Sequence, residues 1–165
     1  MAKILTLDVE EEQQFKLIGL ISPEPDFKLA FLINKHCSFY FQRAEQDVSF
    51  VDPKSKAKSS FALYEYNDEN LMQEWFLVAN KFTKKENGTA DLLGTQATIN
   101  SFLVKDHKQA DYFIQTDIDC VPSLFRTVLK SIKAIPNVIA AYEIDPENLK
   151  HKEHLYYLHE KHEQS

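Results

Sequence analysis

The chain has 165 residues, 44% of them hydrophobic, which suits a single domain with its own core. Nineteen basic and twenty-five acidic residues give a formal net charge of −6, which disfavours non-specific binding to nucleic acid or to an anionic membrane. The only glycines are Gly19, Gly88 and Gly94, which are too far apart to form a phosphate-binding loop. Composition therefore argues against nucleotide binding through a glycine motif.

The start of the chain and its two cysteines bear on the compartment. The N-terminal residues turn acidic at Asp8 without an apolar signal-like segment, and no stretch approaches the roughly eighteen apolar residues of a membrane-spanning helix. Cys37 and Cys120 are far apart and form no CxxC motif. We therefore expect a cytoplasmic protein with reduced thiols, no membrane association and no bound cofactor.

The first third of the chain predicts a strand, a helix and a second strand. Residues 15–21 are a short apolar strand, and the Ser-Pro-Glu-Pro-Asp sequence that follows is typical of a helix start. The helix should span residues 26–37. Its apolar residues form a wide stripe, so we expect much of its surface to be buried. Residues 38–42 are expected to form the next strand.

The middle of the chain is rich in strands. Residues 52–59 are polar and rich in lysine, which indicates an exposed connection, and two strands are predicted at 61–66 and 75–80. The Asn87-Gly88 pair indicates a hairpin turn. Residues 92–103 are compatible with either a strand or a helix.

The last third predicts a strand over residues 110–116, an amphipathic helix and a strand over 138–144. The apolar residues of the helix, from Val121 to Ile135, recur at helical spacing on one face. Asp119 is the expected N-cap and Pro136 the stop signal.

These elements predict an α+β fold. We expect an antiparallel sheet with two main helices on one face, in a ferredoxin-like β-α-β…β-α-β order with a β-rich insertion. Residues 1–146 should form the domain, and residues 147–165 a polar, histidine-rich tail. The junction at 132–138, where a helix meets a proline-containing turn and a strand, resembles the corresponding turn of the ligand-binding ACT domains.

A longer resemblance rests on residues 104–112, Val-Lys-Asp-His-Lys-Gln-Ala-Asp-Tyr. This segment resembles the signature of the IPExxxVDY family. Asp111 and Tyr112 match it, whereas Val104, Lys105, Asp106 and Ala110 stand where the signature has Ile, Pro, Glu and Val. Residues 32–35 and 75–81 are similar to other recurring segments of that family. The resemblance implies a single cytoplasmic domain of a small bacterial protein and implies no chemistry.

Aromatic residues on the predicted central strands are candidate partner-binding residues. On a two-residue period Tyr64 and Tyr66 lie opposite Phe61, and Trp75 is on a neighbouring strand. If the Phe61 face is the core, the tyrosines lie on the outside of the sheet. There they would meet a covering helix, a second copy, a protein partner or, together with the lysines at 54, 56 and 58, stacked RNA bases.

Polar residues at the ends of elements form a second group of candidates. Asn80 and Lys81 end a strand, where they can bind a carboxylate or phosphate or simply satisfy backbone groups. Asp111 and Tyr112 begin another strand. Asp111 is either a buried acid that holds a partner or an exposed residue at the strand end.

Four histidines, His151, His154, His159 and His162, lie within twelve residues near the C-terminus. Imidazoles three residues apart on a helix can share zinc or nickel. The alternative is a solvated tail that binds no metal.

No GxSxG or HExxH motif occurs, and no carboxylate pair is brought together by sequence spacing. We therefore expect a non-catalytic interaction or regulatory module that binds a protein partner or itself. An RNA-binding module and an ACT-like sensor of a small molecule remain the alternatives.

Overall fold

A six-stranded antiparallel sheet forms the centre of the molecule. The computed structural model describes residues 14–85 and 97–156. In spatial order the strands are β10 (Ala140–Ile144), β1 (Phe15–Ile21), β9 (Tyr112–Asp117), β6 (Gln73–Ala79), β5 (Leu63–Asp68) and β2 (Gln42–Arg43). Every neighbouring pair is antiparallel. The chain thus has the mixed α+β fold that the sequence predicts, while the ferredoxin-like designation stays a prediction.

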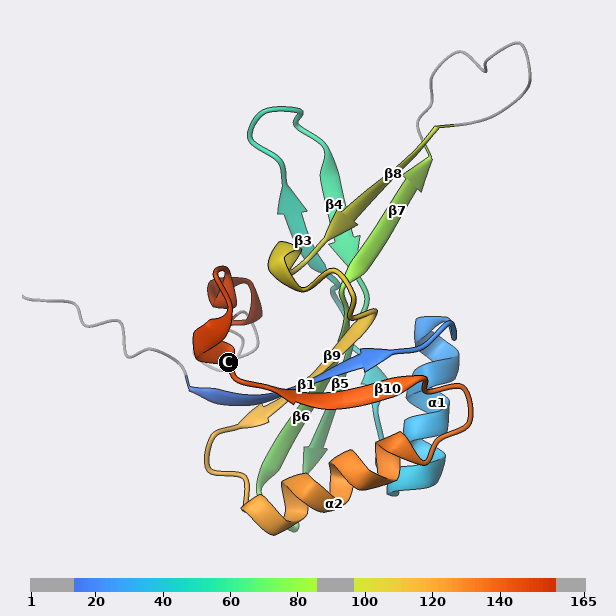
Figure 1. Ribbon diagram of the computed structural model, residues 1–165, viewed down its shortest axis with the longest axis vertical. Helices are drawn as coiled ribbons and strands as arrows, with labels where there is room; N and C mark the ends of the chain where they lie inside the picture. The colour runs from blue at the N-terminus through green and yellow to red at the C-terminus, as the bar shows by residue number, and fades with distance from the viewer. Residues whose placement is uncertain (1–13, 86–96, 157–165) are drawn as a thin grey trace, which may run out of the picture.

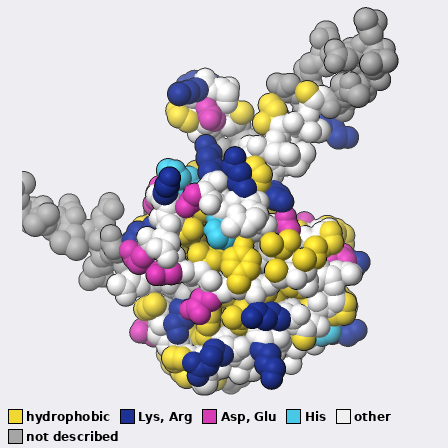
Figure 2. Space-filling model, viewed as in Figure 1, with side chains coloured by type: hydrophobic (Ala, Val, Ile, Leu, Met, Phe, Trp, Pro, Cys, Tyr) yellow, Lys and Arg dark blue, Asp and Glu magenta, His cyan; other side chains and the backbone are white. Residues whose placement is uncertain are grey.

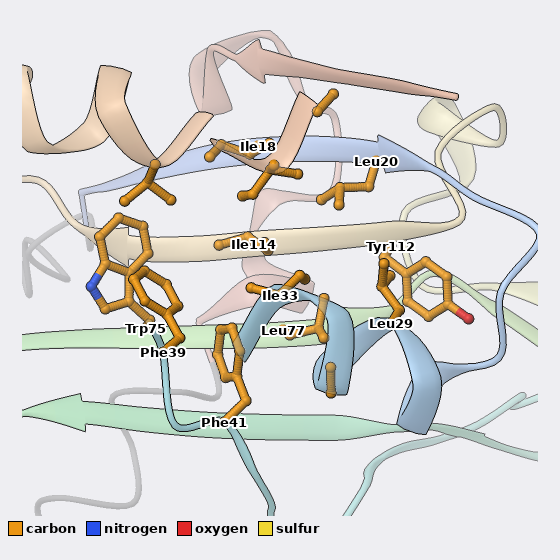
Figure 3. Close-up of a cluster of buried hydrophobic side chains, with 14 of the residues drawn as sticks. Ile18, Leu20, Leu29, Ile33, Phe39, Phe41, Trp75, Leu77, Tyr112 and Ile114 are labelled. Atoms are coloured by element: carbon orange, nitrogen blue, oxygen red, sulfur yellow. The ribbon is translucent and has the colours of Figure 1, made fainter. Parts of the chain in front are cut away.

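The two main helices, α1 (Asp26–Cys37) and α2 (Pro122–Lys133), cover the same face of this sheet (Figure 1). The core beneath them joins helix residues such as Leu29 and Ile33 to strand residues such as Ile114. Figure 3 shows Trp75 and Phe39 side by side at one end of this cluster and Tyr112 at the other, with its hydroxyl pointing away from the apolar side chains. Burial of large apolar side chains is the main term that stabilises this layer.

The opposite face is covered by two hairpins and three short 3-10 helices. The hairpins are β3 (Val48–Val51) with β4 (Lys58–Phe61), and β7 (Lys81–Lys85) with β8 (Thr98–Phe102). The 3-10 helices are η1 (Lys105–His107), η2 (Pro146–Asn148) and η3 (Lys152–Leu155). Hairpin residues such as Val48 and Phe61, together with Leu155 of η3, form a second core with Leu17, Phe76, Val78 and Phe113 of the sheet. Both hairpins project from the sheet on the side away from the helices (Figure 1).

The predicted helices and the first strand are confirmed, but several strand predictions are wrong. Residues 38–41 are irregular, and only Gln42 and Arg43 pair with β5. The strand predicted at 61–66 is two elements, because β4 ends at Phe61 in a hairpin and β5 begins at Leu63 in the main sheet. Residues 98–102 are strand β8. The Asn87-Gly88 turn lies outside the described residues, although the strands on either side of it pair in antiparallel register.

The ends and faces of the two helices also need correction. Among the described residues no side chain caps α2; its N-cap is Val121 rather than Asp119, and Pro122 begins the helix with the fixed φ that suits a first turn. Helix α1 is less buried than expected, because Phe27 and Phe31 are 67% and 63% exposed. Only one side of α1 meets the sheet, so the outer part of its wide apolar stripe faces solvent.

The segment predicted as a polar tail belongs in part to the body of the protein. Leu149 and Leu155 are buried in the second core, and the Tyr156 ring packs edge-on against Phe15 with the ring centroids 6.2 Å apart. Residues 157–165 lie outside the described residues. No helix within 14–85 or 97–156 is long and apolar enough to cross a membrane.

Candidate functional site

Four of the predicted site residues gather where α1 begins beside the ends of β6 and β9. Lys81, Asp111 and Tyr112 line one surface hollow of about 330 Å³. A neighbouring hollow of about 370 Å³ shares Lys81 and Tyr112 and is also lined by Asp26 and Arg43. Tyr64 reaches this place through its hydroxyl, which donates a 2.7 Å hydrogen bond to Asp26. The fold therefore unites residues that are up to 48 positions apart in the sequence, from Tyr64 to Tyr112.

Asp111 is held on both of its carboxylate oxygens. Oδ1 pairs with Nζ of Lys81 at 2.5 Å, and Oδ2 accepts a 2.9 Å hydrogen bond from the backbone N–H of Ser22. Ser22 is only 4% exposed, so its N–H depends on this carboxylate. Of the two alternatives for Asp111, the structure shows a half-buried acid that fastens the loop before α1 to the sheet.

A second group of polar contacts surrounds Asp26. Its Oδ2 accepts hydrogen bonds from Tyr64 and from Nη1 of Arg43, the latter at 2.9 Å. Arg43 also forms a two-pronged ion pair with Asp47, with distances of 2.6 and 2.8 Å from Nη2 to the two oxygens. Arginine suits this role because its planar guanidinium can contact two carboxylates at once.

Two tyrosines at this place keep their protons to higher pH than usual. Burial raises the pKa of Tyr112, and nearby Asp26 and Asp111 add to the effect. Burial also raises the pKa of Tyr64, which donates its hydrogen bond to Asp26. Tyr112 donates to the carbonyl of Glu24 at 2.6 Å. Both hydroxyls are thus neutral donors that hold the first turn of α1, and neither is poised as a base.

Asn80 lies inside the protein and satisfies backbone groups. Its Nδ2 donates to the carbonyls of His107 and Ala110 at 3.0 and 2.9 Å, and its Oδ1 accepts from the N–H of Val104 at 2.8 Å. The side chain is 0% exposed. Asn80 therefore shapes the loop between β8 and β9, and a partner cannot reach it in this conformation.

Of the alternatives for Tyr64 and Tyr66, the structure shows the covering helices. Both lie on the face that carries the helices: Tyr64 is buried in the first core, and Tyr66 packs partly buried against it, with its ring 5.1 Å from that of Phe39. Trp75 is 1% exposed. The two-residue alternation gave the correct faces, but Phe61 belongs to a hairpin, and both faces of the sheet are covered.

A large, mainly apolar cleft lies between the two hairpins, and no predicted site residue apart from His154 lines it. It has a volume of about 600 Å³. Phe50 and Val51 of β3 line one side and Ile99 and Phe102 of β8 the other, with Phe61 and Leu103 also in the lining. Val51 is 60% exposed and Ile99 47%. Figure 2 shows hydrophobic and lysine side chains close together on the projecting hairpins.

The electrostatic surroundings of this cleft are positive although the chain as a whole is acidic. Lys84 and Lys105 line it, and Lys54, Lys56 and Lys58 lie exposed in the adjacent turn and strand of the β3–β4 hairpin. Asp52 is the only acidic residue of the described lining, and the backbone N–H groups of Ser55 and Lys54 bind its carboxylate and lower its pKa. The lysine-rich segment at 52–59 was the sequence signal beside this cleft, whereas Phe50 and Ile99 resemble ordinary strand residues.

Two of the four predicted histidines lie at the edge of the cleft. His154 lines it and packs on the Phe50 ring, with centroids 4.7 Å apart. His151 stacks on His154, and Glu153 lies beside both, so the three groups could share a metal ion. His159 and His162 lie outside the described residues.

Comparisons with known proteins found no relative of this chain. No family model, no curated protein sequence and no solved structure matches the chain. The resemblance of residues 104–112 to a family signature therefore stays a prediction.

Proposed function

We propose that this protein is a non-catalytic interaction module that binds an extended segment of a partner protein in the cleft between its two hairpins. The observation that carries the proposal is the exposed apolar lining of that cleft, including Phe50, Val51 and Ile99. Apolar hollows of several hundred Å³ lined by aromatic side chains are typical binding sites.

The shape of the cleft favours an extended chain. In the part of the chain that the structure describes, β3 pairs with β4 alone and β8 with β7 alone, so each has one edge without a strand neighbour. A free edge offers backbone N–H and C=O groups to another strand, and pockets beside it select alternate side chains.

The charges of the cleft favour carboxylates on the partner. Lys84 and Lys105 line it, while the carboxylate of Asp52 is occupied by backbone N–H groups. Complementary charge mainly raises the association rate and selects the partner, whereas burial of apolar side chains provides most of the affinity. We therefore infer a partner segment that carries bulky apolar residues together with Asp or Glu.

The first experiment is selection from a displayed library of random peptides on the immobilised protein. We expect the selected peptides to be enriched in apolar and acidic residues. Ile99→Lys and Lys84→Glu should each weaken their binding at least about tenfold. Matched controls are Ile139→Lys and Lys35→Glu, which change exposed residues outside the cleft. Selected peptides rich in Lys and Arg, or peptides that bind the Ile99→Lys variant as well as the unaltered protein, would contradict the proposal.

RNA binding is the second candidate, and one observation favours it: the β3–β4 hairpin carries exposed lysines as well as Phe50, which is 36% exposed. Stacking on an aromatic ring beside lysines is a mode of single-strand binding. Polyuridylate RNA in low salt is the probe. RNA that binds and displaces the selected peptides, with affinity that falls steeply as salt rises, would replace the peptide proposal by the RNA one.

A further inference from the structure

The C-terminal 3-10 helix η3 brings together three groups that bind transition metals. His151, Glu153 and His154 each present a ligand atom, and these atoms lie within 4.8 Å of one another. The sequence His-Lys-Glu-His places the two imidazoles three residues apart, which on a 3-10 turn puts them on the same side.

The orientation of His154 is fixed by the protein. Its Nδ1 lies 2.8 Å from the carbonyl oxygen of Leu103, and a carbonyl can only accept, so Nδ1 carries the proton. Nε2 of the neutral ring then has a free lone pair. A histidine that donates one ring N–H to a backbone carbonyl and presents the other nitrogen is the usual arrangement of a metal-binding histidine.

The other two groups lie beside the ring of His154. The rings of His151 and His154 are nearly parallel, with an interplanar angle of 12° and centroids 5.3 Å apart. Nδ1 of His151 lies 3.1 Å from Oε1 of Glu153. The alternative to a metal site is a simple ion pair between His151 and Glu153. Such a pair explains their contact, but it does not explain why His154 is oriented beside them.

We propose that His151, Glu153 and His154 bind one divalent cation of the zinc class. Two imidazole nitrogens and a carboxylate oxygen, with water in a fourth position, suit zinc and related borderline ions. Bonds of about 2.0 to 2.1 Å in a tetrahedron place ligand atoms about 3.3 Å apart. The side chains of His151 and Glu153 are 46% and 54% exposed, so small rotations of both can close the cluster around the ion.

The position of the cluster gives the ion a structural consequence. His154 contacts Leu103 at the end of β8 and the Phe50 ring of β3. A metal on these three residues would therefore hold together the segment whose His154 contacts both hairpins at the edge of the cleft. The unfolded chain has no preformed site for the ion. Binding to the folded protein should therefore also raise the thermal unfolding temperature.

Titration of untagged full-length protein with zinc(II), followed by calorimetry, tests the site. We expect one ion per chain. His151→Ala and Glu153→Gln change exposed side chains, so both variants should fold and should weaken zinc binding at least about tenfold. His36→Ala, which removes an exposed histidine of α1, is the matched control and should bind as the unaltered protein does.

The double variant His159→Ala/His162→Ala separates this cluster from the histidines outside the described residues. Zinc binding that is unchanged in His151→Ala and Glu153→Gln, whether or not the double variant abolishes it, would overturn the proposal. So would the absence of binding at millimolar zinc. The intensity of the visible absorption of the cobalt(II) complex provides a second readout, because tetrahedral sites absorb much more strongly than octahedral ones.

Discussion

At the scale of single residues, Asn80 contributes more to the stability of the fold than its place at the end of a strand suggests. It makes three hydrogen bonds to backbone groups of residues 104, 107 and 110. Asn80→Ala leaves the N–H of Val104 and the carbonyl of Ala110 unpaired inside the protein, each at a cost of about 1 to 3 kcal/mol, whereas the carbonyl of His107 keeps the N–H of Ala110. We expect urea unfolding to show a loss of about 3 kcal/mol or more. A loss below 1 kcal/mol would mean that water replaces the amide.

The pair of Lys81 and Asp111 allows a sharper test, because only one partner has a second role. Lys81 is 46% exposed, and an ion pair at such a site contributes about 1 kcal/mol or less. Asp111 also binds the buried N–H of Ser22. Asp111→Ala should therefore destabilise the protein by about 1 to 3 kcal/mol, and Lys81→Ala by clearly less. Equal losses in urea unfolding would show that the ion pair, and not the loop, accounts for the effect.

At the scale of elements, the start of α1 is anchored by tyrosine hydroxyls, which makes it sensitive to alkaline pH. The pKa values of Tyr64 and Tyr112 are raised in the folded protein. Above about pH 10, the ordinary value, the unfolded chain releases these protons while the folded protein keeps them. The contribution of these two tyrosines to the free energy of unfolding should therefore be constant below that pH and fall above it, by up to about 1.4 kcal/mol per pH unit for each tyrosine.

Tyr112→Phe tests this explanation. The variant should be less stable at pH 8, because the carbonyl of Glu24 loses its donor, and its stability should fall less steeply between pH 10 and 11. Tyr40→Phe, at a residue that is 72% exposed, is the control and should leave the slope unchanged. An unchanged slope in Tyr112→Phe would contradict the assignment.

Elements that depend on local sequence could be predicted, and those that depend on distant partners could not. The bounds of α1 follow from the proline-rich start, and the apolar face of α2 follows from helical spacing. The break at Ala62 leaves no such signal, because whether Phe61 and Leu63 continue one strand depends on which strands lie beside them. For the same reason, the two-residue alternation of side chains predicted on which face of the sheet Tyr64 lies but not which elements cover that face.

At the scale of the whole molecule, the sequence located the residues of the hollow beside α1 but not the cleft between the hairpins. Asp111, Tyr112 and Lys81 were identified as polar residues at strand ends, and the fold brings them together around α1. Their hydrogen bonds are internal, which indicates a structural role. The cleft depends instead on how the two hairpins lie relative to each other where they project from the sheet, and no local pattern encodes that arrangement (Figure 1).

The most direct measurement of the central claim is the change in backbone amide NMR shifts when a selected acidic, apolar peptide is added to the labelled protein. Binding in the cleft predicts that the largest changes occur in β3, β4, β7 and β8, with Val51 and Ile99 among them, and that Ile99→Lys abolishes them. Changes centred instead on the hollow around Lys81 and Asp111, or on the exposed face of α1, would contradict the account.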